Sequence, residues 1–427
     1  MSGEIPSKSF CAFPFVNFFS TNFGDVKLCC YAKDTTKNKI GESIGPQNSH
    51  DTFSWWNEEG QLKARKQMLA GEWPEACEKC QKDETLGESS YRHSANWYWF
   101  THHPEEMQFR IQEASANEGR LSRLPAYWDL RFSNLCNLKC RSCAPEYSSG
   151  IESEYAKIAS LQPGFVAINQ EFRVKLPKVS PTESWVRPFF TNQPFLDGLK
   201  QIKSIYLGGG EPSFIPENQE FLKLVVDQGL ASQIHLTFNS NLSLINPELL
   251  ELAGHFKKTT LIMSLDAWGE KNEYIRHGSQ WNRTLGNLQK LLLCYPKFEF
   301  YVSTVIQLYN LLDITELWTR LNEISEKQKK EILIAPILLY EPEFLSVDLA
   351  PDTLRKESVE KIQAFLKNSQ NEYVNKQLRS LSKRLQRSQN SDEKNSLFQF
   401  FEFTKSLDQS RGQDFKTLLP ELAQHLV

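Results

Sequence analysis

The sequence predicts an α/β fold built around a parallel sheet. Between residues 127 and 340, short apolar runs alternate with stretches in which apolar residues recur at helical spacing. Alternation of strand and helix favours parallel strands joined by right-handed crossovers. The predicted strands are Tyr127–Phe132, Ile202–Leu207, Ile234–Asn239, Thr259–Asp266, Phe298–Ile306 and Ile332–Leu339. The predicted helices between them include Glu217–Gln228, Pro247–His255, Trp281–Leu293 and Ile314–Ile324.

Composition narrows the class of protein. The chain has 427 residues, 40% hydrophobic and 24% charged, so it is globular and long enough for more than one core. Its formal net charge of −3 gives no reason to expect a nucleic-acid partner. It has no apolar run of about 18 residues, and its N-terminus lacks a secretory pattern, so we expect no membrane span and a cytoplasmic location. The nine cysteines are clustered, which suits metal binding better than a disulfide framework.

Three cysteines follow the first predicted strand. Cys136, Cys140 and Cys143 have the spacing Cys-x3-Cys-x2-Cys. A loop that leaves a strand can direct three thiolates at one point, which would hold an iron–sulfur cluster and leave one iron open. Structural zinc is the main alternative, but it prefers four ligands, usually as two separated pairs. We therefore interpret the triplet as the ligands of an iron–sulfur cluster.

The triplet resembles the signature of the radical S-adenosylmethionine (SAM) enzymes. Gly209-Gly210-Glu211-Pro212 is similar to the motif that holds the methionine end of SAM in that family. The resemblance spans about residues 127 to 340 and implies a partial (β/α)6 TIM-like barrel with a 4Fe–4S cluster that cleaves SAM. At Ser142, before the last cysteine, the family usually has an aromatic residue.

The same resemblance implies further SAM-binding residues. Ser240-Asn241 is similar to the family's Thr-Asn-Gly stretch, with Leu242 in place of the glycine, and Asn239 is adjacent. Ser264 and Asp266 end the next predicted strand on one face, and Arg276 follows in a pattern known from SPASM-bearing members. An arginine there can pair with the SAM carboxylate. The alternative is that Asp266 and Arg276 form only a surface pair or cap.

Four more cysteines precede the barrel region. Cys11 and Cys29 flank a predicted turn at Asn22–Asp25, in the pattern Cys-x12-Gly-x4-Cys, and Cys77 and Cys80 form a Cys-x2-Cys pair. From spacing alone, zinc and an iron–sulfur cluster are both open. The pattern is similar to SPASM/twitch modules, which carry auxiliary 4Fe–4S clusters but usually follow the barrel. Cys30 is then either an alternate ligand or a buried thiol.

These features predict four regions and a function. The regions are an auxiliary cluster module (1–94), a connector (95–125), a radical SAM barrel (126–341) and a C-terminal helical extension (342–427). The 161–194 insert is a lid or a surface excursion. Cys294 lies on an apolar helix and is expected to be a core thiol.

The predicted activity is that of a radical SAM oxidoreductase or maturase. Its substrate is a peptide or a small polar metabolite such as a sugar or aminocyclitol. A flavodoxin or ferredoxin would supply electrons, and the auxiliary cluster would accept one from the substrate or serve only structure. Only ten residues precede Cys11, which weakens a fused peptide-recognition module. The alternative is a non-catalytic metal-binding interaction protein on the same scaffold.

Overall fold

The computed structural model describes residues 5–33, 53–85, 87, 89–162, 184–387 and 393–426. The chain forms two compact units. The first comprises Met1–Ser133, Pro177–Thr237 and Glu248–Thr259; the second comprises Asn134–Leu176, Phe238–Pro247 and Thr260–Val427. Each unit therefore contains part of the region, residues 127 to 340, in which strands and helices alternate.

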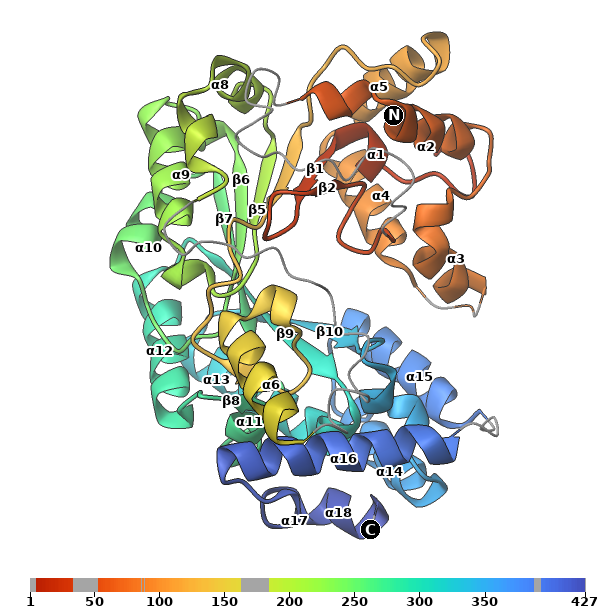
Figure 1. The fold of residues 1–427 in the computed structure, drawn as a ribbon, viewed down its shortest axis with the longest axis vertical. Coiled ribbons are helices and arrows are strands. Elements are labelled where there is room, and N and C mark those ends of the chain that lie inside the picture. Colours follow the sequence, from red (N-terminus) through yellow and green to blue (C-terminus); the bar gives the residue numbers. More distant parts are fainter. Residues whose placement is uncertain are drawn as a thin grey trace. The chain divides into compact units, whose positions relative to one another are not determined.

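The sheet of the first unit combines early and late strands (Figure 1). Its strands are β1 (Asn17–Ser20), β2 (Val26–Lys27), β3 (Tyr127–Leu130), β5 (Ser204–Leu207) and the start of β6 (His235–Ser240). They follow the order β6-β5-β3-β1-β2. Strand β3 lies parallel to both β5 and β1, with Phe18 opposite Trp128. Strands β1 and β2 are antiparallel around the turn predicted at Asn22–Asp25.

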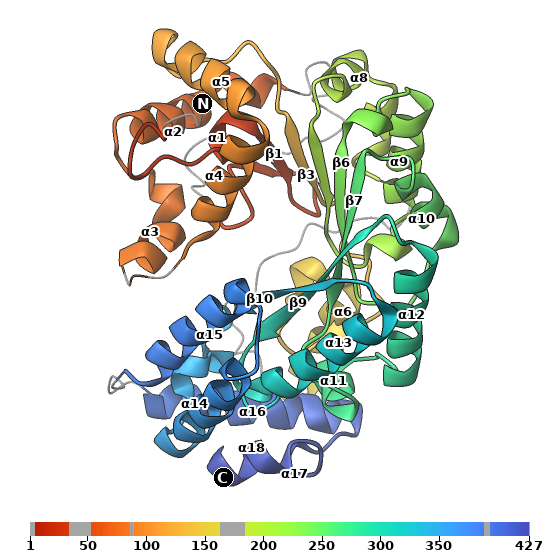
Figure 2. The same ribbon diagram turned by 180° about the vertical axis from the view of Figure 1, so that it is seen from behind.

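Helices lie on both sides of these strands (Figure 2). Trp128 of β3 is fully buried, and its ring centroid lies 4.9 Å from Phe195 of α8 and 6.3 Å from Phe221 of α9. The helices of this unit are α1 (Phe13–Val16), α2 (Glu59–Leu69), α3 (Glu78–Thr85), α4 (Tyr91–His102), α5 (Pro104–Ala116), α8 (Gln193–Leu199), α9 (Pro216–Asp227) and α10 (Pro247–Ala253). Short 3-10 helices are η3 (Ser54–Asn57), η4 (Glu75–Cys77), η7 (Arg187–Thr191), η8 (Pro212–Phe214) and η9 (Ala231–Gln233).

The second unit has its own parallel strands. Strands β10 (Ile332–Leu338), β9 (Glu299–Ile306) and β7 (Lys258–Ser264) are neighbours in that order. Every second residue of β9 is buried, as its alternating sequence predicts. Strand β4 (Lys139–Cys140) forms a separate antiparallel ribbon with β8 (Arg276–His277).

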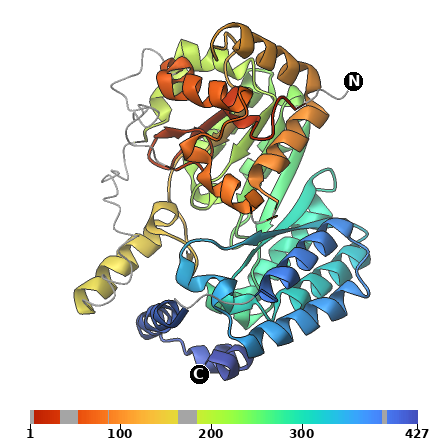
Figure 3. The ribbon, with the colours of Figure 1, turned by 90° about the vertical axis from the view of Figure 1, so that its right-hand side faces the viewer.

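The C-terminal part of the second unit is helical from Asp352 on. Helix α16 contacts α6, and the two are drawn in blue and yellow in Figure 3. The helices of this unit are α6 (Ser149–Leu161), α11 (Glu270–Ile275), α12 (Trp281–Cys294), α13 (Ile314–Gln328), α14 (Asp352–Leu366), α15 (Glu372–Leu385), α16 (Glu393–Arg411), α17 (Phe415–Leu418) and α18 (Pro420–Leu426). Its 3-10 helices are η5 (Pro145–Tyr147), η10 (Leu308–Asn310), η11 (Glu343–Leu345) and η12 (Val347–Leu349).

The mixed α/β class and the parallel sheet are confirmed. The predicted strands correspond to β3, β5, β6, β7, β9 and β10, and the predicted helices to α9, α10, α12 and α13. Closure into a partial barrel stays a prediction. One expectation is wrong: Cys294 is exposed because it is the last residue of α12, beyond the turns that pack on the core. Most of the 161–194 insert lies outside the described residues. No helix in the described part of the chain has the length and apolar character needed to cross a membrane.

Candidate active site

The three-cysteine loop pairs with a distant segment of the chain in a short antiparallel ribbon. Cys140 of β4 is the registered partner of Arg276 of β8. The Cys143 amide donates a hydrogen bond of 3.2 Å to the Cys140 carbonyl, and the Leu138 amide donates one of 3.5 Å to the Cys136 sulfur. Burial, followed by the charges of Cys140 and Cys136, raises the pKa of Cys143. The three thiols therefore lie near one another, as ligands of one cluster would.

Arg276 forms the cationic side of this loop. Its Nη1 donates a hydrogen bond of 2.8 Å to Oδ2 of Asp266, and Oδ1 of Asp266 accepts one of 2.8 Å from the Val305 amide. Asp266, which follows Ser264 at the end of β7, is fully buried, so the pair is not a surface ion pair. Burial lowers the pKa of Arg276, but the charges of Cys140 and Asp266 outweigh burial and raise it.

One nitrogen of Arg276, Nε, can donate a hydrogen bond to a ligand. Its Nε is buried and has no hydrogen-bond partner among the described residues. A buried donor without a partner costs free energy, about 1–3 kcal/mol, unless something accepts from it. A carboxylate fits this nitrogen, because the guanidinium group pairs well with planar anions.

The end of β6 supplies polar groups to the same unit. Asn239 and Ser240 are the last residues of the strand, and Asn241 follows. The Asn241 Nδ2 donates a hydrogen bond of 3.0 Å to Oδ1 of Asn137 and lies 4.0 Å from the Cys136 sulfur. The predicted stretch therefore contacts the cysteine loop directly.

Leu242 occupies a backbone position that favours glycine. Its φ is +61°, in the left-handed region that side chains with a Cβ rarely adopt. Its amide donates a hydrogen bond of 3.1 Å to the Ser240 hydroxyl, and the side chain is fully buried. Leu242 thus adopts the left-handed conformation of this turn at some cost in backbone strain. Burial of its side chain and the hydrogen bond to Ser240 act against that cost.

The glycine motif belongs to the first unit and has a steric cause. Gly209 has φ +103°, and a Cβ there would lie 2.6 Å from the Ser133 carbonyl oxygen and 3.0 Å from Oδ1 of Asn22. The Gly210 amide donates a hydrogen bond of 3.0 Å to the same Ser133 carbonyl. Only glycine fits at position 209 without displacing the backbone.

Glu211 follows these glycines as a buried carboxylate. Only 2% of the residue is exposed, and its Oε1 accepts a hydrogen bond of 3.3 Å from the Ser213 amide. This bond caps η8, so the backbone orients the side chain. A carboxylate held in this way can accept from an ammonium group.

Cys11, Cys29, Cys77 and Cys80 line one small cavity in the first unit. Aromatic and cationic side chains complete its wall, namely Phe13, Tyr31, Trp73, Tyr91 and Arg92. Burial, followed by the charge of Cys77, raises the pKa of Cys11 well above its usual range. Burial and Cys80 raise the pKa of Cys77 to about 12. Two cysteine pairs far apart in sequence thus meet at one place.

Cys30 differs from these four cysteines. It is absent from the residues that line their cavity. Burial, followed by the charge of Asp129, raises the pKa of Cys30 to about 12, and Arg131 opposes the rise. Cys30 therefore lies nearer than Cys29 to Asp129 of β3 and to Arg131, which follows this strand.

The thiol-only donor sets suit iron–sulfur clusters. In the described residues, no three His, Cys, Asp or Glu side chains are grouped closely enough to hold one metal ion. Around a single tetrahedral zinc, sulfur ligands lie roughly 3.8 Å apart, given Zn–S bonds of about 2.3 Å. A cluster with several irons accepts thiolates that are spread more widely. The convergence of three and of four thiols is thus compatible with two clusters.

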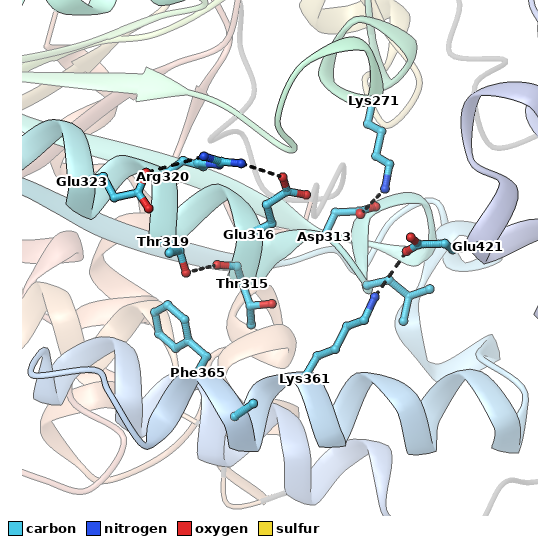
Figure 4. Close-up of a pocket in the computed structure, with 12 residues that line it drawn as sticks. Lys271, Asp313, Thr315, Glu316, Thr319, Arg320, Glu323, Lys361, Phe365 and Glu421 are labelled. Atoms are coloured by element: carbon cyan, nitrogen blue, oxygen red, sulfur yellow. Dashed lines mark hydrogen bonds and ion pairs between the residues drawn. The ribbon is translucent and has the colours of Figure 1, made fainter.

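A charged hollow elsewhere in the second unit carries no thiol (Figure 4). Its cations face carboxylates: Lys271 lies 2.5 Å from Asp313, and Lys361 lies 3.3 Å from Glu421. Arg320 lies between two further glutamates of α13. Because each of these cations is paired with a carboxylate of the same wall, we assign no chemistry to the hollow.

Comparisons with known proteins rest on structure alone. No family model matches the chain, and no curated protein sequence matches it. One similar solved structure is Streptococcus suis SuiB bound to the precursor peptide SuiA, with 15% identity and a TM-score of 0.36 over 72% of this chain and 63% of that chain. Another is anSMEcpe with bound AdoMet and the Cp18Cys peptide, with 12% identity and a TM-score of 0.34 over 57% of this chain and 60% of that chain.

A third similar structure is TYW1 with a lysine–pyruvate adduct, with 17% identity and a TM-score of 0.29 over 58% of this chain and 72% of that chain. These neighbours are radical SAM enzymes. The chain spans only 63% of the length of SuiB.

Proposed function

We propose that this protein is a radical SAM enzyme. The observation that carries the proposal is the register of Cys140 with Arg276, which sets a buried arginine beside the three-cysteine loop. The loop offers three ligands for a cluster, and the arginine offers a donor for an anion. A packing role alone explains neither the grouped thiols nor the buried Nε without a partner.

Each group has a role in binding the cofactors. Cys136, Cys140 and Cys143 hold a 4Fe–4S cluster with one open iron. In the second unit, Arg276 would bind a carboxylate such as that of SAM through Nε. In the first unit, the resemblance implies that Glu211 accepts from an ammonium group such as that of SAM. When bound, the cluster and SAM supply reductive cleavage of SAM to a 5′-deoxyadenosyl radical, which abstracts hydrogen from the substrate.

The remaining predicted residues orient these groups. Asp266 fixes the guanidinium of Arg276, so its free donor keeps one direction. Asn241 holds Asn137 inside the cysteine loop, between two of the ligands. Asn239, Ser240 and Ser264 offer polar groups at strand ends, where we propose contacts to the ribose and the SAM amino acid.

The four cysteines of the first unit hold an auxiliary cluster in this proposal. Cys11, Cys29, Cys77 and Cys80 complete four positions, so this cluster has no open iron for SAM. It suits electron transfer from a substrate radical, which would make the net reaction an oxidation. The cavity that the four residues line supports this ligand set.

The substrate and the cellular location are proposed only as classes. The substrate is a peptide or a small polar metabolite, and a flavodoxin or ferredoxin supplies electrons in the cytoplasm. A non-catalytic metal-binding protein is the second candidate, because grouped thiols alone fit both. Retention of Gly209 and Glu211 with their tight backbone geometry favours the enzyme.

A SAM-cleavage assay separates the two candidates. The full chain is reconstituted anaerobically with iron and sulfide, reduced, and incubated with SAM. The enzyme proposal predicts 5′-deoxyadenosine and methionine in equal amounts. Protein that holds its clusters yet releases no 5′-deoxyadenosine would support the interaction protein instead.

A further inference from the structure

Arg141, which separates Cys140 from Ser142, is fully buried in the second unit. Its amide donates a hydrogen bond of 2.8 Å to the Ile275 carbonyl, and its Nε donates one of 3.0 Å to the Tyr274 carbonyl. The guanidinium carbon lies 3.7 Å from the centre of the Tyr274 ring. The cysteine loop is thus joined to the segment that leads into Arg276.

Asp408 of α16 closes this arrangement from 267 residues away along the chain. Its Oδ1 accepts hydrogen bonds from Nη2 of Arg141 and, at 3.0 Å, from the Tyr274 hydroxyl. Its Oδ2 accepts one of 2.8 Å from the Phe415 amide at the start of α17. One carboxylate therefore connects the cysteine loop, the end of α11 and two C-terminal helices.

A second buried link reaches the other neighbour of Cys140. Lys139 Nζ lies 3.0 Å from Oε1 of Glu154 on α6, and Nη2 of Arg411 on α16 lies 2.7 Å from Oε2. Burial favours the neutral acid, but Arg411 and Lys139 outweigh it and lower the pKa of Glu154. Helices α6 and α16 are side by side in Figures 1 and 3. Both residues flanking Cys140 are thus anchored to α16.

We propose that Asp408 is a positioning residue for the cluster loop and for Arg276. The inference rests on the proposed function, since it assigns a role toward the cluster that Cys140 would hold. Buried ion pairs fix geometry because removing one partner leaves an uncompensated charge. Groups that orient metal ligands act in the same way, and their loss typically lowers metal affinity or activity by about 10- to 100-fold.

If Asp408 only stabilised the fold, the loss of another carboxylate–arginine pair in the extension would have the same effect on the cluster. A control variant tests this alternative. Asp348 also accepts from an arginine, Arg384, at 2.7 Å to Nε, and this pair joins η12 to α15. Asp348 contacts Ser346 and two arginines of the extension, Arg355 and Arg384. Asp348→Asn therefore removes a different carboxylate–arginine pair within the same extension.

The experiment compares Asp408→Asn, Glu154→Gln and Asp348→Asn in the anaerobically reconstituted full chain. The readouts are the EPR signal that SAM perturbs, which belongs to the cluster with an open iron, and its decay in the presence of an iron chelator. Melting of the apo protein reports general destabilisation. Glu154→Gln removes the second anchor and serves as the test if Asp408→Asn does not fold.

Asp408→Asn should lose the SAM-sensitive signal at least about tenfold faster than the parent. Its remaining cluster should respond to SAM at concentrations about tenfold higher, because Arg276 is held less firmly. Asp348→Asn should match the parent in both. Parent-like decay and SAM response in Asp408→Asn and Glu154→Gln would overturn the inference, as would the same losses in Asp348→Asn. A parent chain with no SAM-sensitive cluster would refute the proposed function and this inference with it.

Discussion

Cys140 and Arg276 are registered partners in the antiparallel ribbon of β4 and β8. The ribbon sets a guanidinium group next to a thiol that is otherwise buried, and Asp266 balances the remaining charge. The two roles that we propose here, a ligand for iron and a donor for a carboxylate, are thus assigned to residues that are opposite one another in this ribbon.

Arg276→Lys should weaken SAM binding about 10- to 100-fold while the cluster stays bound. Lysine keeps a cation beside Asp266 and Cys140 but lacks Nε, the donor without a partner. A hydrogen bond to a charged group contributes about 1.5–3 kcal/mol, which gives this range. SAM titration of the reduced EPR signal measures the effect. The matched control is Arg320→Lys, in the hollow of Figure 4, which should keep the parental SAM affinity. If Arg276→Lys binds SAM as tightly as the parent does, Arg276 does not bind the SAM carboxylate.

Glu211→Gln should also weaken SAM binding on the order of 10- to 100-fold. Glutamine keeps an oxygen to cap the Ser213 amide, so η8 should persist, but it removes the charge that attracts an ammonium. Equilibrium dialysis with labelled SAM measures affinity. Glu220→Gln, an exposed site paired with Arg187, is the matched control. A Glu211→Gln protein with parental affinity would place the ammonium grip at another residue.

Changing Cys77 and Cys80 together to Ala should remove one cluster and stop product formation, while SAM cleavage persists. In the proposed function, the four cysteines that line one cavity would share that cluster, and SAM cleavage would use the other. Iron analysis and 5′-deoxyadenosine yield are the measurements. Cys30→Ala should keep both clusters, since Cys30 does not line the cavity.

Two outcomes would count against that account of the auxiliary cluster. Loss of SAM cleavage in folded Cys77→Ala/Cys80→Ala protein would assign the cluster to structure. Zinc in place of iron after anaerobic purification would rule out an electron acceptor, because zinc has no redox chemistry.

The sequence predicted the parts of the fold that depend on local pattern. Strand β9 alternates buried and open residues, and α12 repeats its apolar residues at helical spacing, so each segment carries its own signal. The turn at Gly24 predicted the β1–β2 hairpin for the same reason. Polar residues at strand ends were found by motif and position.

Contacts between distant segments left no such signal. Strand β1 pairs with β3 across more than a hundred residues, and only the backbone register shows that the hairpin extends the parallel sheet. Asp408 reads in the sequence as one acid on a charged helix, although it contacts Arg141. Arg141 lies between two of the three cysteines in the sequence, and this position could have singled it out. An arginine that is buried beside such a loop requires partners.

Stability should fall as the pH decreases from about 6.5 to about 4, in part through His103. Burial, followed by nearby His102, Lys203 and Lys257, lowers the pKa of His103 to about 4, against about 6.5 in the unfolded chain. Its neutral form therefore stabilises the fold fully above pH 6.5, and this contribution is lost as the pH falls through the folded value. Urea midpoints at pH 7 and pH 5 measure the change.

His103→Gln should make the urea midpoint less sensitive to pH between these values. His255→Gln, at an exposed position that is not among the groups acting on His103, is the control and should keep the parental dependence. The His103 assignment fails if both variants show the same loss between pH 7 and pH 5 as the parent.

The most direct test of the central claim is an iron count with and without the three-cysteine loop. The full chain is reconstituted anaerobically, and iron, sulfide and 5′-deoxyadenosine yield are compared with those of Cys136→Ala/Cys140→Ala/Cys143→Ala. The account predicts two clusters in the parent, one in the variant, and SAM cleavage only in the parent. An iron content that the triple change leaves unaltered, or SAM cleavage that survives it, would contradict the account.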